Sequence, residues 1–584
     1  MRTLLRLMVF VQKHWGWLLL AFLCLVATTA FSLVVPYILG TAIDTVLQAG
    51  ERSFLYLAAG IIVGAFALRG VSAYGYSYLS AIISQKACYD IRNVLYNKLQ
   101  RLSFAYHDQA QTGQLMSRAT ADVEAVRMFF GRGLLGIVQM LILLVGIFCI
   151  LLLQNWQLAL LALAFLPAIG WRAVANGLRL GPMWLKIQQL IAALGTTLEE
   201  SLTGIRVVKA FARQKEESQK FSADAKVLYN EHISVARQFA FNRHLMVFLI
   251  SLPTALILWY GGRQVIAGSL TIGGLTQFIL YLGIAVMPVR RLGFMTIILS
   301  RTVSAGQRIL EILDAQSPVQ EKPNAIELGS LKGQVCFEDV SFSYNSMAPA
   351  LKKINFSVQP GELVALVGSS GSGKSTIARL IPRFYDVSSG HLTVDGIDIR
   401  DVTIASLRKN VVAVQQDVFL FSATIRDNIA FGAINASMEQ IVTVAKIAYL
   451  HDFVHSLPDG YDTWVGERGV TLSGGEKQRL AIARTLLTNP RILILDDSTS
   501  SVDAETEHLI RQALDKLIKG RTTFIITHRL PIIKNADLIL VLKEGQIVER
   551  GRHSDLMARN GLYRQIYQSQ LSVTQDFGGS LIEE

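Results

Sequence analysis

The sequence is poor in charged residues and in cysteine. Only 17 % of its 584 residues are charged and 51 % are hydrophobic, whereas soluble domains carry about 25 % charged residues. This composition excludes an intrinsically disordered chain and a collagen-like chain, and it argues against an ordinary soluble enzyme. The four cysteines lie far apart and form no C-x-x-C pair. Neither a disulfide framework nor a cysteine-based zinc site is therefore predicted.

Charged residues are missing from several long stretches before residue 300. A helix needs about 20 apolar residues to cross a bilayer. The longest uncharged stretch, Gly133–Trp171, is long enough for two crossings, and the polar Gln154–Gln157 in its middle predicts the turn between them. The sequence therefore predicts six membrane spans. Their approximate limits are 16–40, 54–83, 133–153, 156–175, 245–265 and 272–297.

Positive charge is distributed unequally between the segments that connect the spans. Lys86–Arg132 and Arg172–Arg243 carry seven and eleven Lys and Arg residues, whereas the three loops on the other side carry only Arg52 and Arg263. Cytoplasmic loops are enriched in Lys and Arg, so both long segments are predicted to be cytoplasmic. Six spans then place both termini in the cytoplasm. We expect a multi-pass protein of the cytoplasmic (inner) membrane, and no nucleic acid partner.

From residue 335 onward, short β-branched runs alternate with helical segments, which is typical of a parallel α/β sheet. The predicted organisation is a six-span transmembrane domain at 1–313, a linker at 314–334, an α/β domain at 335–568 and a tail at 569–584. The two basic segments contain few Gly or Pro, so the spans are expected to continue into the cytoplasm as long helices.

Two motifs in the α/β region predict a nucleotide site. A predicted strand leads into Gly368-Ser-Ser-Gly-Ser-Gly-Lys374-Ser375, which fits a P-loop. Its glycines allow backbone N–H groups to surround phosphate oxygens, Lys374 faces the β- and γ-phosphates, and Ser375 can bind Mg²⁺. Asp496 ends a second buried strand and is placed as the carboxylate that holds Mg²⁺ through water. ATP and Mg²⁺ are therefore the expected cofactors.

A second glycine motif, Leu472–Arg479, places Ser473-Gly474-Gly475 at the predicted start of a helix, where backbone N–H groups favour an anion. One P-loop domain has no need of a second such site, whereas two facing domains can close each other's nucleotide sites. The motif resembles the signature motif of ABC ATPases. With the six spans, the chain resembles an ABC exporter half-transporter from about Pro36 to Gln568. The resemblance implies a multi-pass α-helical transmembrane domain followed by an α/β P-loop ABC ATPase domain.

The resemblance implies roles for further residues. Tyr344 corresponds to the aromatic residue that stacks on adenine, Gln416 to the Q-loop glutamine near Mg²⁺ and the attacking water, and His528 to the switch histidine at the γ-phosphate. The implied catalytic residues are Asp497, His528 and Gln416, and the implied metal ligands are Ser375, Gln416 and Asp496. The implied nucleotide-binding residues are Tyr344, Gly368, Ser369, Ser370, Gly371, Ser372, Gly373, Lys374, Ser375, Thr376, Ser473, Gly474 and Gly475.

Three segments are similar to the parts of exporters that join the ATPase domain to the membrane domain. Stretches near Tyr106–Gly113 and Phe211–Glu216 resemble the coupling helices that rest on the ATPase domains. The alternative interpretation of these stretches is a solvated charged face. Trp464 replaces the usual glutamate of the X-loop, while Glu467 is retained.

Asp497 departs from the family pattern, which has Glu at this position to polarise the attacking water. Asp is shorter by one carbon–carbon bond, about 1.5 Å, and a misplacement of about 1 Å can lower a rate about 10²-fold. We therefore expect this chain's own site to bind ATP and hydrolyse it slowly, as in the degenerate subunit of heterodimeric bacterial exporters. The partner would be a different half-transporter that supplies a catalytic Glu. The alternative is a homodimer in which Asp497 serves as the base.

The sequence thus predicts ATP-driven export of a hydrophobic or amphipathic substrate, such as a drug, a lipid or a peptide, by a dimer of half-transporters. The alternatives are an importer, whose ATPase is usually a separate chain, and a non-transporting regulatory membrane subunit gated by ATP. Ionisable residues near the spans are functional candidates by default, and these are Asp44, Arg69, Arg132, Arg290 and Arg291. Arg69 and Arg132 suit an anionic or amphipathic cargo. The alternative for many of these charged side chains is that they snorkel to lipid headgroups or bridge helices.

Overall fold

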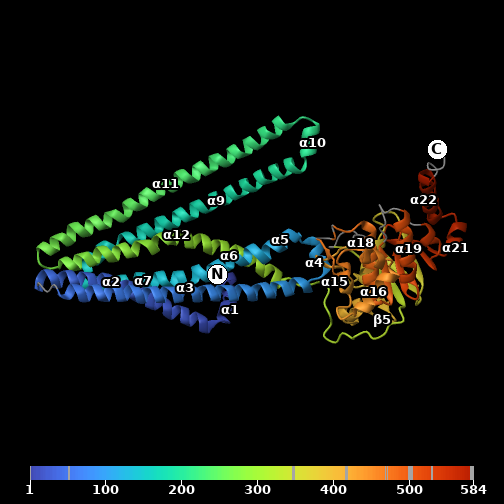
Figure 1. The fold of residues 1–584 in the computed structure, drawn as a ribbon, viewed down its shortest axis with the longest axis horizontal. Coiled ribbons are helices and arrows are strands. Elements are labelled where there is room, and N and C mark those ends of the chain that lie inside the picture. Colours follow the sequence, from blue (N-terminus) through green and yellow to red (C-terminus); the bar gives the residue numbers. More distant parts are fainter. Residues whose placement is uncertain are drawn as a thin grey trace. The chain divides into compact units, whose positions relative to one another are not determined.

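The computed structural model describes residues 2–49, 53–344, 349–414, 418–466, 469, 471–496, 504–527 and 530–578. The chain forms two compact units (Figure 1). The first consists of Met1–Arg101 and Ala110–Ala315 and is called the membrane unit. The second consists of Leu102–Gln109 and Gln316–Glu584 and is called the α/β unit. A short segment of the N-terminal half of the chain therefore belongs to the C-terminal unit.

The membrane unit is built from long helices. Within the described residues, six segments are long and apolar enough to cross a membrane, which confirms the prediction of six spans. Their main helices are α2 (Trp15–Ala49), α3 (Ser53–Arg101), α7 (Leu135–Gln154), α8 (Trp156–Leu163) with α9 (Phe165–Thr203), α11 (Gln214–Ile266) and α12 (Ile272–Asp314). The third segment also includes α5 (Thr112–Ser117), α6 (Val123–Met128) and π-helical turns at Arg118–Asp122 and Phe129–Leu134. Helix α3 has 49 residues and α11 has 53, more than twice the length that a bilayer requires.

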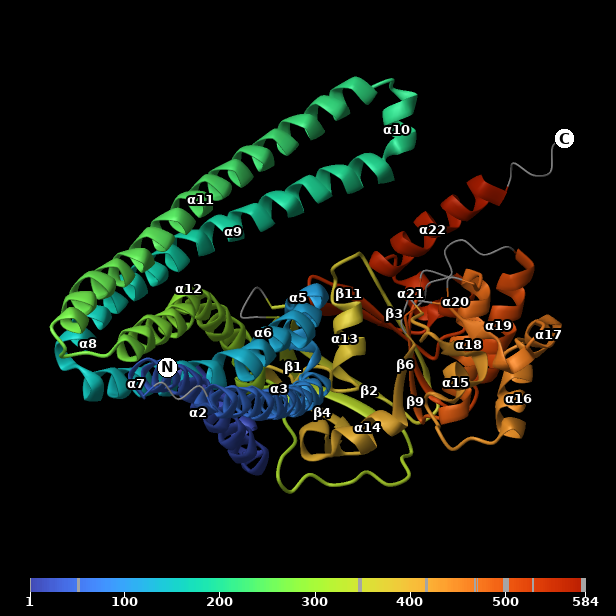
Figure 2. The ribbon, with the colours of Figure 1, turned by 60° about the vertical axis from the view of Figure 1, so that its left-hand side comes forward.

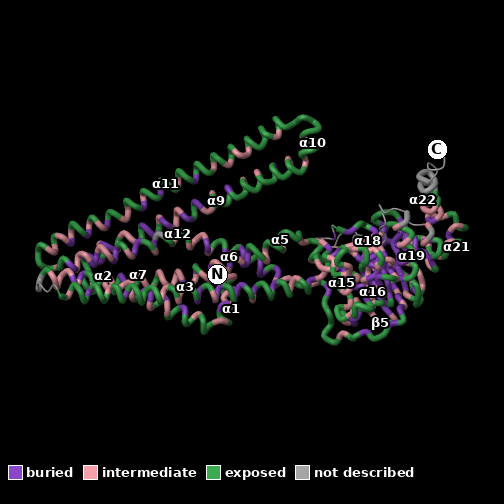
Figure 3. Tube along the Cα trace, in the orientation of Figure 1, coloured by how far each residue is buried: buried purple, intermediate pink, exposed green. Residues whose placement is uncertain are grey.

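Within the membrane unit, α9 and α11 lie side by side and are joined by the short helix α10 (Ile205–Ala210), as Figure 2 shows. Residues near this junction are mostly exposed (Figure 3). The opposite ends of the helices hold a compact apolar cluster in which Phe278 and Tyr281 are fully buried. There, Asn155 ends α7 and its side-chain Oδ1 accepts a hydrogen bond from the Leu158 backbone N–H at 3.1 Å. The predicted turn between the third and fourth spans is therefore present.

The α/β unit contains a six-stranded sheet of order β12-β11-β3-β10-β9-β6. Its strands pair in parallel except at the β11–β12 edge, which is antiparallel. A second, antiparallel sheet has the order β2-β1-β4-β5. The α/β fold predicted from the sequence is confirmed. The strands are β1 (Val335–Phe342), β2 (Leu351–Val358), β3 (Leu363–Gly368), β4 (Ser389–Val394), β5 (Ile397–Asp398), β6 (Val411–Val414), β7 (Ala423–Thr424), β8 (Trp464–Val465), β9 (Ile492–Asp496), β10 (Thr522–Ile526), β11 (Leu538–Lys543) and β12 (Gln546–Gly551).

Helices cover the six-stranded sheet because its central strands are apolar throughout. All five residues of β10 are buried, and so are the first four of β9, as expected for parallel strands with both faces covered. The helices of this unit are α4 (Phe104–Gln109), α13 (Lys374–Leu380), α14 (Ile404–Asn410), α15 (Ile425–Ala430), α16 (Met438–Ile447), α17 (His451–Ser456), α18 (Gly474–Thr488), α19 (Ala504–Ile518), α20 (Leu530–Lys534), α21 (His553–Ala558) and α22 (Leu562–Gly578). Short 3₁₀ turns lie at Ile399–Asp401 and Gly460–Asp462, and α1 (Arg2–Gln12) begins the membrane unit.

Three boundaries differ from those expected from the sequence. Helix α22 continues to Gly578, so most of the expected tail at 569–584 extends the last helix. The short helix α4 overlaps the expected coupling segment Tyr106–Gly113 and begins two residues earlier, whereas α10 ends directly before the expected segment Phe211–Glu216. These two helices are only six residues long. Fewer than two turns of helix give too little periodicity in the sequence for the helix to be located accurately.

Candidate functional site

The P-loop connects the end of β3 to the first turn of α13. Lys374 opens α13, and its ammonium folds back to donate hydrogen bonds of 2.8 Å to the carbonyl oxygens of Gly368 and Ser369. Gly373 has a φ of +108°, and a Cβ atom there would lie 2.7 Å from a methyl carbon of Leu351. Only glycine fits this position without strain. The loop is thereby closed around the lysine.

The loop carries unused hydrogen-bonding capacity, as a phosphate site requires. The hydroxyl of Ser372 is buried and has no hydrogen-bond partner among the described residues, and such groups are uncommon in folded proteins. Gly371, at φ +77°, has open space around the position of a Cβ atom. Ser375 is exposed beside it at the start of α13, while Thr376 is buried. Hydroxyl and backbone N–H groups suit phosphate oxygens and Mg²⁺.

The sheet topology brings Asp496 to the same edge as the P-loop. Strand β10 lies between β3 and β9, and the three strands are parallel, with Ile526 paired to both Leu366 and Asp496. The carboxyl ends of β3 and β9 therefore meet at one edge. Burial lowers the pKa of the Lys374 ammonium, and the charge of Asp496 opposes that shift. The two motifs that the sequence placed 122 positions apart thus act on one another electrostatically.

Tyr344 follows β1 and lies beside the P-loop helix. Its ring packs edge-on against Phe342, with 4.7 Å between centroids, and against Tyr385, with 5.1 Å between centroids. Its hydroxyl donates to the Thr376 Oγ1 atom of α13 at 3.4 Å. The structure thus places this half-buried aromatic ring beside the helix that follows the P-loop, and its role in base stacking stays a prediction.

The second glycine motif begins α18 with a capping box. The Ser473 backbone N–H donates to a Glu476 carboxylate oxygen at 2.8 Å, and the Glu476 backbone N–H donates to the Ser473 hydroxyl at 3.4 Å. Ser473 and Gly474 are exposed, and a Cβ atom on Gly474 would meet nothing within 4 Å. The positive end of α18 is therefore open to an external anion.

Three predicted catalytic residues lie outside the described residues: Gln416, Asp497 and His528. The segment after Asp496 that includes Ser500-Ser501-Val502-Asp503, and the X-loop residue Glu467, lie outside them as well. The catalytic roles assigned to Gln416, Asp497 and His528 stay predictions. Trp464 is described, is 60 % exposed and donates its indole N–H to the Ser422 hydroxyl at 3.2 Å.

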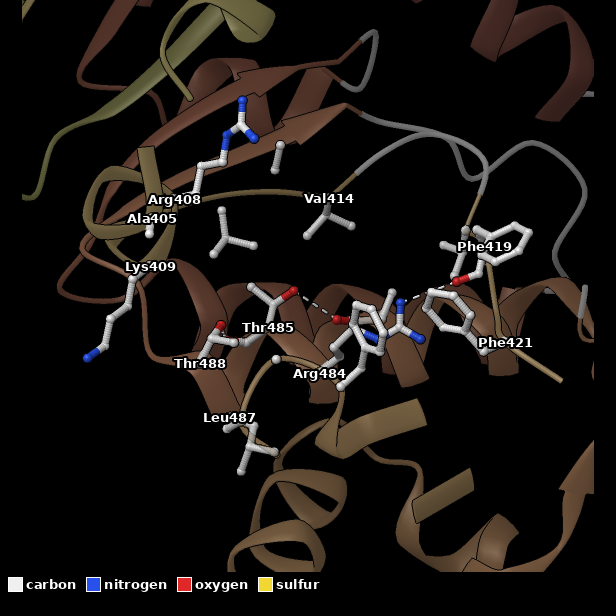
Figure 4. Close-up of a pocket in the computed structure, with 17 residues that line it drawn as sticks. Ala405, Arg408, Lys409, Val414, Phe419, Phe421, Arg484, Thr485, Leu487 and Thr488 are labelled. Carbon is white, nitrogen blue, oxygen red and sulfur yellow. Dashed lines mark hydrogen bonds between the residues drawn. The ribbon is translucent and has the colours of Figure 1, made fainter. Parts of the chain in front are cut away.

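An apolar groove of about 660 Å³ in the α/β unit was not anticipated from the sequence (Figure 4). Phe419, Phe421 and Phe431 line it around Arg484 of α18. The Arg484 guanidinium lies 5.6 Å from the Phe431 ring centroid, and its Nε donates to the Asn428 carbonyl at 2.8 Å. Burial lowers the pKa of Arg484. A single arginine within a helix gives no periodic signal in the sequence, so only the tertiary structure shows that Arg484 lies among the phenylalanines of the groove.

Helix α4 is held on the α/β unit by aromatic contacts. Phe104 stacks on Phe384 with 4.1 Å between ring centroids, and Ala105 packs against the apolar core of the unit. The Tyr385 hydroxyl donates a hydrogen bond to the Asp108 carboxylate. This segment of the expected coupling helix Tyr106–Gly113 therefore contacts the domain that carries the P-loop.

A cavity of about 1250 Å³ in the membrane unit is rich in arginine. Arg69, Arg127, Arg132 and Arg291 line it together with several serine and threonine hydroxyls, and the described lining residues include no carboxylate. Arg127 pairs with Glu124, its Nε donating to a carboxylate oxygen at 2.7 Å. Among the described residues, no carboxylate pairs with the other three. The sequence singled out these three and missed Arg127.

Asp44 bridges two helices, which is the alternative to a functional role that was expected for charges near the spans. Its carboxylate accepts hydrogen bonds of 2.7 Å from the Gly273 backbone N–H and from the Thr271 hydroxyl. It therefore satisfies the first turn of α12. Nothing is described of the Arg290 side chain.

Comparison with protein families places both units of the chain. Residues 18–289 match the family model described as ABC transporter transmembrane region, and residues 351–500 match the one described as ABC transporter. The two matched ranges cover most of the chain. The first contains most of the six-span region, and the second contains the P-loop.

Individual relatives match over nearly their whole length. An uncharacterized ABC transporter ATP-binding protein of Bacillus subtilis, YknU, is 38 % identical over 96 % of this chain and 95 % of its own. An ATP-dependent lipid A-core flippase of Syntrophus aciditrophicus is 36 % identical over 97 % of this chain and 94 % of its own. Among solved structures, a bacterial Atm1-family ABC exporter with ATP bound matches with a TM-score of 0.80 and 31 % identity, covering 95 % of this chain and 98 % of the exporter chain.

Proposed function

The chain belongs to the ABC transporter family, as its motifs predicted, and we propose that it is one subunit of a dimeric exporter that moves an amphipathic substrate out across the cytoplasmic membrane. The observation that carries this proposal is the P-loop and Asp496 at one edge of a sheet, on a chain that also forms six spans. The fusion of membrane and ATPase parts on one chain favours an exporter over an importer. By this proposal the α/β unit and both termini are cytoplasmic.

The residues of the α/β unit have separate tasks in this proposal. The backbone N–H groups of the P-loop and the Lys374 ammonium would hold the phosphates of ATP, and Tyr344 would stack on its adenine. Ser375 and Asp496 would hold Mg²⁺. Hydrolysis of the bond between the β- and γ-phosphates of ATP held there, which releases ADP and inorganic phosphate, would supply the free energy. Differential binding of ATP to two arrangements of a dimer is sufficient to shift the population between them.

The exposed start of α18 supports a dimer. Ser473 and Gly474 are open to an external anion, so this end can close the nucleotide site of a second subunit. Asp497 in place of Glu supports a heterodimer, in which this chain binds ATP and the partner's site, closed by Ser473–Gly475 here, carries out most of the hydrolysis.

The coupling segments would transmit the closure of the two ATPase domains to the spans. Helix α4 already contacts the α/β unit of its own chain. Val207 within α10 is 61 % exposed, and Phe211 directly after this helix is 75 % exposed, so a partner surface that buries these two apolar side chains would stabilise the contact. The phenylalanine-lined groove of a dimer partner's α/β unit offers one of matching chemistry.

The arginine-lined cavity supports a substrate that is anionic as well as amphipathic. Three arginines that pair with no carboxylate in the described part of the chain face a cavity that is also lined by apolar side chains such as Met287 and Phe294. Arginine binds carboxylate and phosphate groups through paired hydrogen bonds, and these bonds are stronger where water is scarce. The cavity therefore suits an acidic headgroup attached to an apolar body.

ATP turnover by the purified chain alone in lipid tests the proposal. We expect wild type to be nearly inactive and Asp497→Glu to be active. Lys374→Ala, introduced into each of these two proteins, gives the background rate of ATP hydrolysis. Normal turnover by wild type would contradict the heterodimer and leave a homodimeric exporter that uses Asp497. ATP-dependent uptake of substrate into inside-out vesicles, measured with the partner present, separates transport from a purely regulatory role, because a gated regulator moves no substrate.

A further inference from the structure

Helix α4 is joined to the nucleotide-binding loop by a continuous row of side chains. Asp108 of α4 accepts a hydrogen bond from the Tyr385 hydroxyl. The Tyr385 ring packs edge-on against Tyr344, with 5.1 Å between centroids and 86° between planes. The Tyr344 hydroxyl donates to Thr376, in the helix that follows the P-loop, at 3.4 Å. All four residues belong to the α/β unit.

The middle of this row rests on a rigid base. Arg383 is 2 % exposed, donates through Nε to the Asp386 carboxylate at 2.7 Å and through Nη2 to the Gln320 carbonyl at 2.9 Å. Phe384 stacks on Phe104, and the Arg408 guanidinium lies 5.1 Å from the centroid of the Phe384 ring. The backbone on both sides of Tyr385 is therefore held in place independently of its hydroxyl.

The Tyr385 hydroxyl is consequently the polar link between a fixed segment and α4. Tyr385 is 7 % exposed. Burial and the neighbouring carboxylate of Asp108 raise the pKa of Tyr385, so the hydroxyl stays protonated and able to donate. Arg379 of α13 interacts electrostatically with Tyr344, Tyr385 and Asp108. A displacement of α4 therefore acts on Tyr385 through this hydroxyl, in addition to its effect on Phe384 through the Phe104 stack.

We propose that Tyr385 is a positioning residue that couples helix α4 to the adenine-stacking ring of Tyr344. When Asp108 holds the Tyr385 hydroxyl, the edge of the Tyr385 ring sets the orientation of Tyr344 and thereby the affinity for the base. The coupling acts equally in the other direction, because binding free energies are reciprocal between linked sites. A base stacked on Tyr344 therefore steadies α4. This inference rests on the proposed function for the stacking role of Tyr344.

The test uses the full chain in lipid nanodiscs and measures binding, so that slow hydrolysis does not interfere. Tyr385→Phe removes the hydroxyl and keeps the ring, and Asp108→Ala removes the acceptor. We expect each to weaken the affinity for the fluorescent nucleotide MANT-ATP by about threefold to tenfold, the range given by loss of one hydrogen bond. The double variant should be no weaker than either single one, because both remove the same link. Affinity for inorganic triphosphate, which lacks a base, should stay unchanged.

A second readout follows α4 itself. Hydrogen exchange of the Phe104–Gln109 amides should slow on addition of ATP in wild type, and this protection should be absent in Tyr385→Phe. The matched control is Tyr461→Phe, which removes a hydroxyl that lies 2.9 Å from His451 Nδ1 in the same unit and should change neither affinity nor protection.

The outcomes separate the inference from the proposed function. If Tyr344→Ala abolishes tight MANT-ATP binding while Tyr385→Phe binds and protects α4 as wild type does, the inference is overturned and the proposed function stands. Equal losses of MANT-ATP and triphosphate affinity in Tyr385→Phe also overturn it, because they indicate a general structural defect. If wild type binds no MANT-ATP, both are overturned.

Discussion

Gly273, in the first turn of α12, packs so closely against Gly40 of α2 that a Cβ atom on Gly273 would overlap the Gly40 carbonyl oxygen. Asp44 reinforces this contact by accepting the Gly273 backbone N–H. One turn further along α12, the buried side chain of Gln277 donates to the Tyr37 carbonyl at 3.1 Å and accepts a hydrogen bond from Gln154. Two glycines and the side chains of Asp44 and Gln277 thus form a seam between α2 and α12, and Gln154 of α7 joins it at one end.

Substituting Gly273 with Ala should open this seam. The added methyl group meets backbone, which cannot rotate away, and overpacking of this kind costs about 1–3 kcal/mol. We expect the thermal midpoint of the protein in lipid to fall, and the distance between spin labels on the adjoining ends of α2 and α12 to increase. Gly262→Ala is the matched control, since a Cβ atom there meets nothing within 4 Å. An unchanged spin-label distance in Gly273→Ala would mean that the seam does not hold the two helices together.

Replacing the cavity arginines should reduce the preference of the protein for anionic substrates. Arg69→Gln, Arg132→Gln and Arg291→Gln should each reduce uptake of an anionic fluorescent lipid about tenfold or more, because each removes a charge-assisted hydrogen-bond donor. A lipid of the same tail and fluorophore with a trimethylammonium headgroup should lose little. Arg263→Gln, which removes an arginine that lies over the Trp259 ring outside the cavity, is the control. Equal loss for both lipids would contradict an anionic cargo.

Removing the cap of α18 should affect two properties at once. Ser473→Ala deletes the hydroxyl that caps the helix, which costs about 1 kcal/mol of stability, and also removes a donor from the site offered to the partner. We therefore expect a modest loss of stability together with loss of ATP turnover by the heterodimer. Ser437→Ala removes the equivalent capping box of α16, so it should lower stability similarly and leave turnover intact. If both variants retain turnover, Ser473 serves only as a helix cap.

Asp398 should make the α/β unit sensitive to acid. Burial alone would raise the pKa of Asp398, but hydrogen bonds from Arg400 and His391 outweigh it and lower the pKa to about 2. An unfolded aspartate titrates near 3.9, so this carboxylate stabilises the fold fully above about pH 4 and loses its contribution as the pH falls toward 2. The stability difference between wild type and Asp398→Asn, measured by circular dichroism, should be constant above pH 5 and shrink toward pH 2. A difference independent of pH would contradict this assignment.

Sequence alone predicted those parts of the molecule that depend on long or rigid patterns. Six apolar stretches define six spans, and parallel strands bring Lys374 and Asp496 to one edge of the sheet whatever the loops do. It could not predict contacts that depend on the packing of single side chains, such as Tyr385 against Tyr344. Arg127 was not predicted to line the cavity, because the sequence shows only an arginine in a basic segment and the packing of the helices decides what this arginine faces. Asp44 was singled out as a charge near a span, and only the position of α12 shows that it caps a helix.

The discontinuous chain path of the α/β unit has a consequence for anyone who excises that unit. Leu102–Gln109 belongs to it, yet a fragment that starts at residue 316 lacks this segment and exposes the Phe384 ring, on which Phe104 stacks, and the part of the apolar core that Ala105 covers. Such a fragment is therefore an incomplete fold, and its exposed apolar surface favours aggregation. A synthetic peptide covering 102–109 should act as its missing piece, raising solubility and melting temperature through complementation in trans.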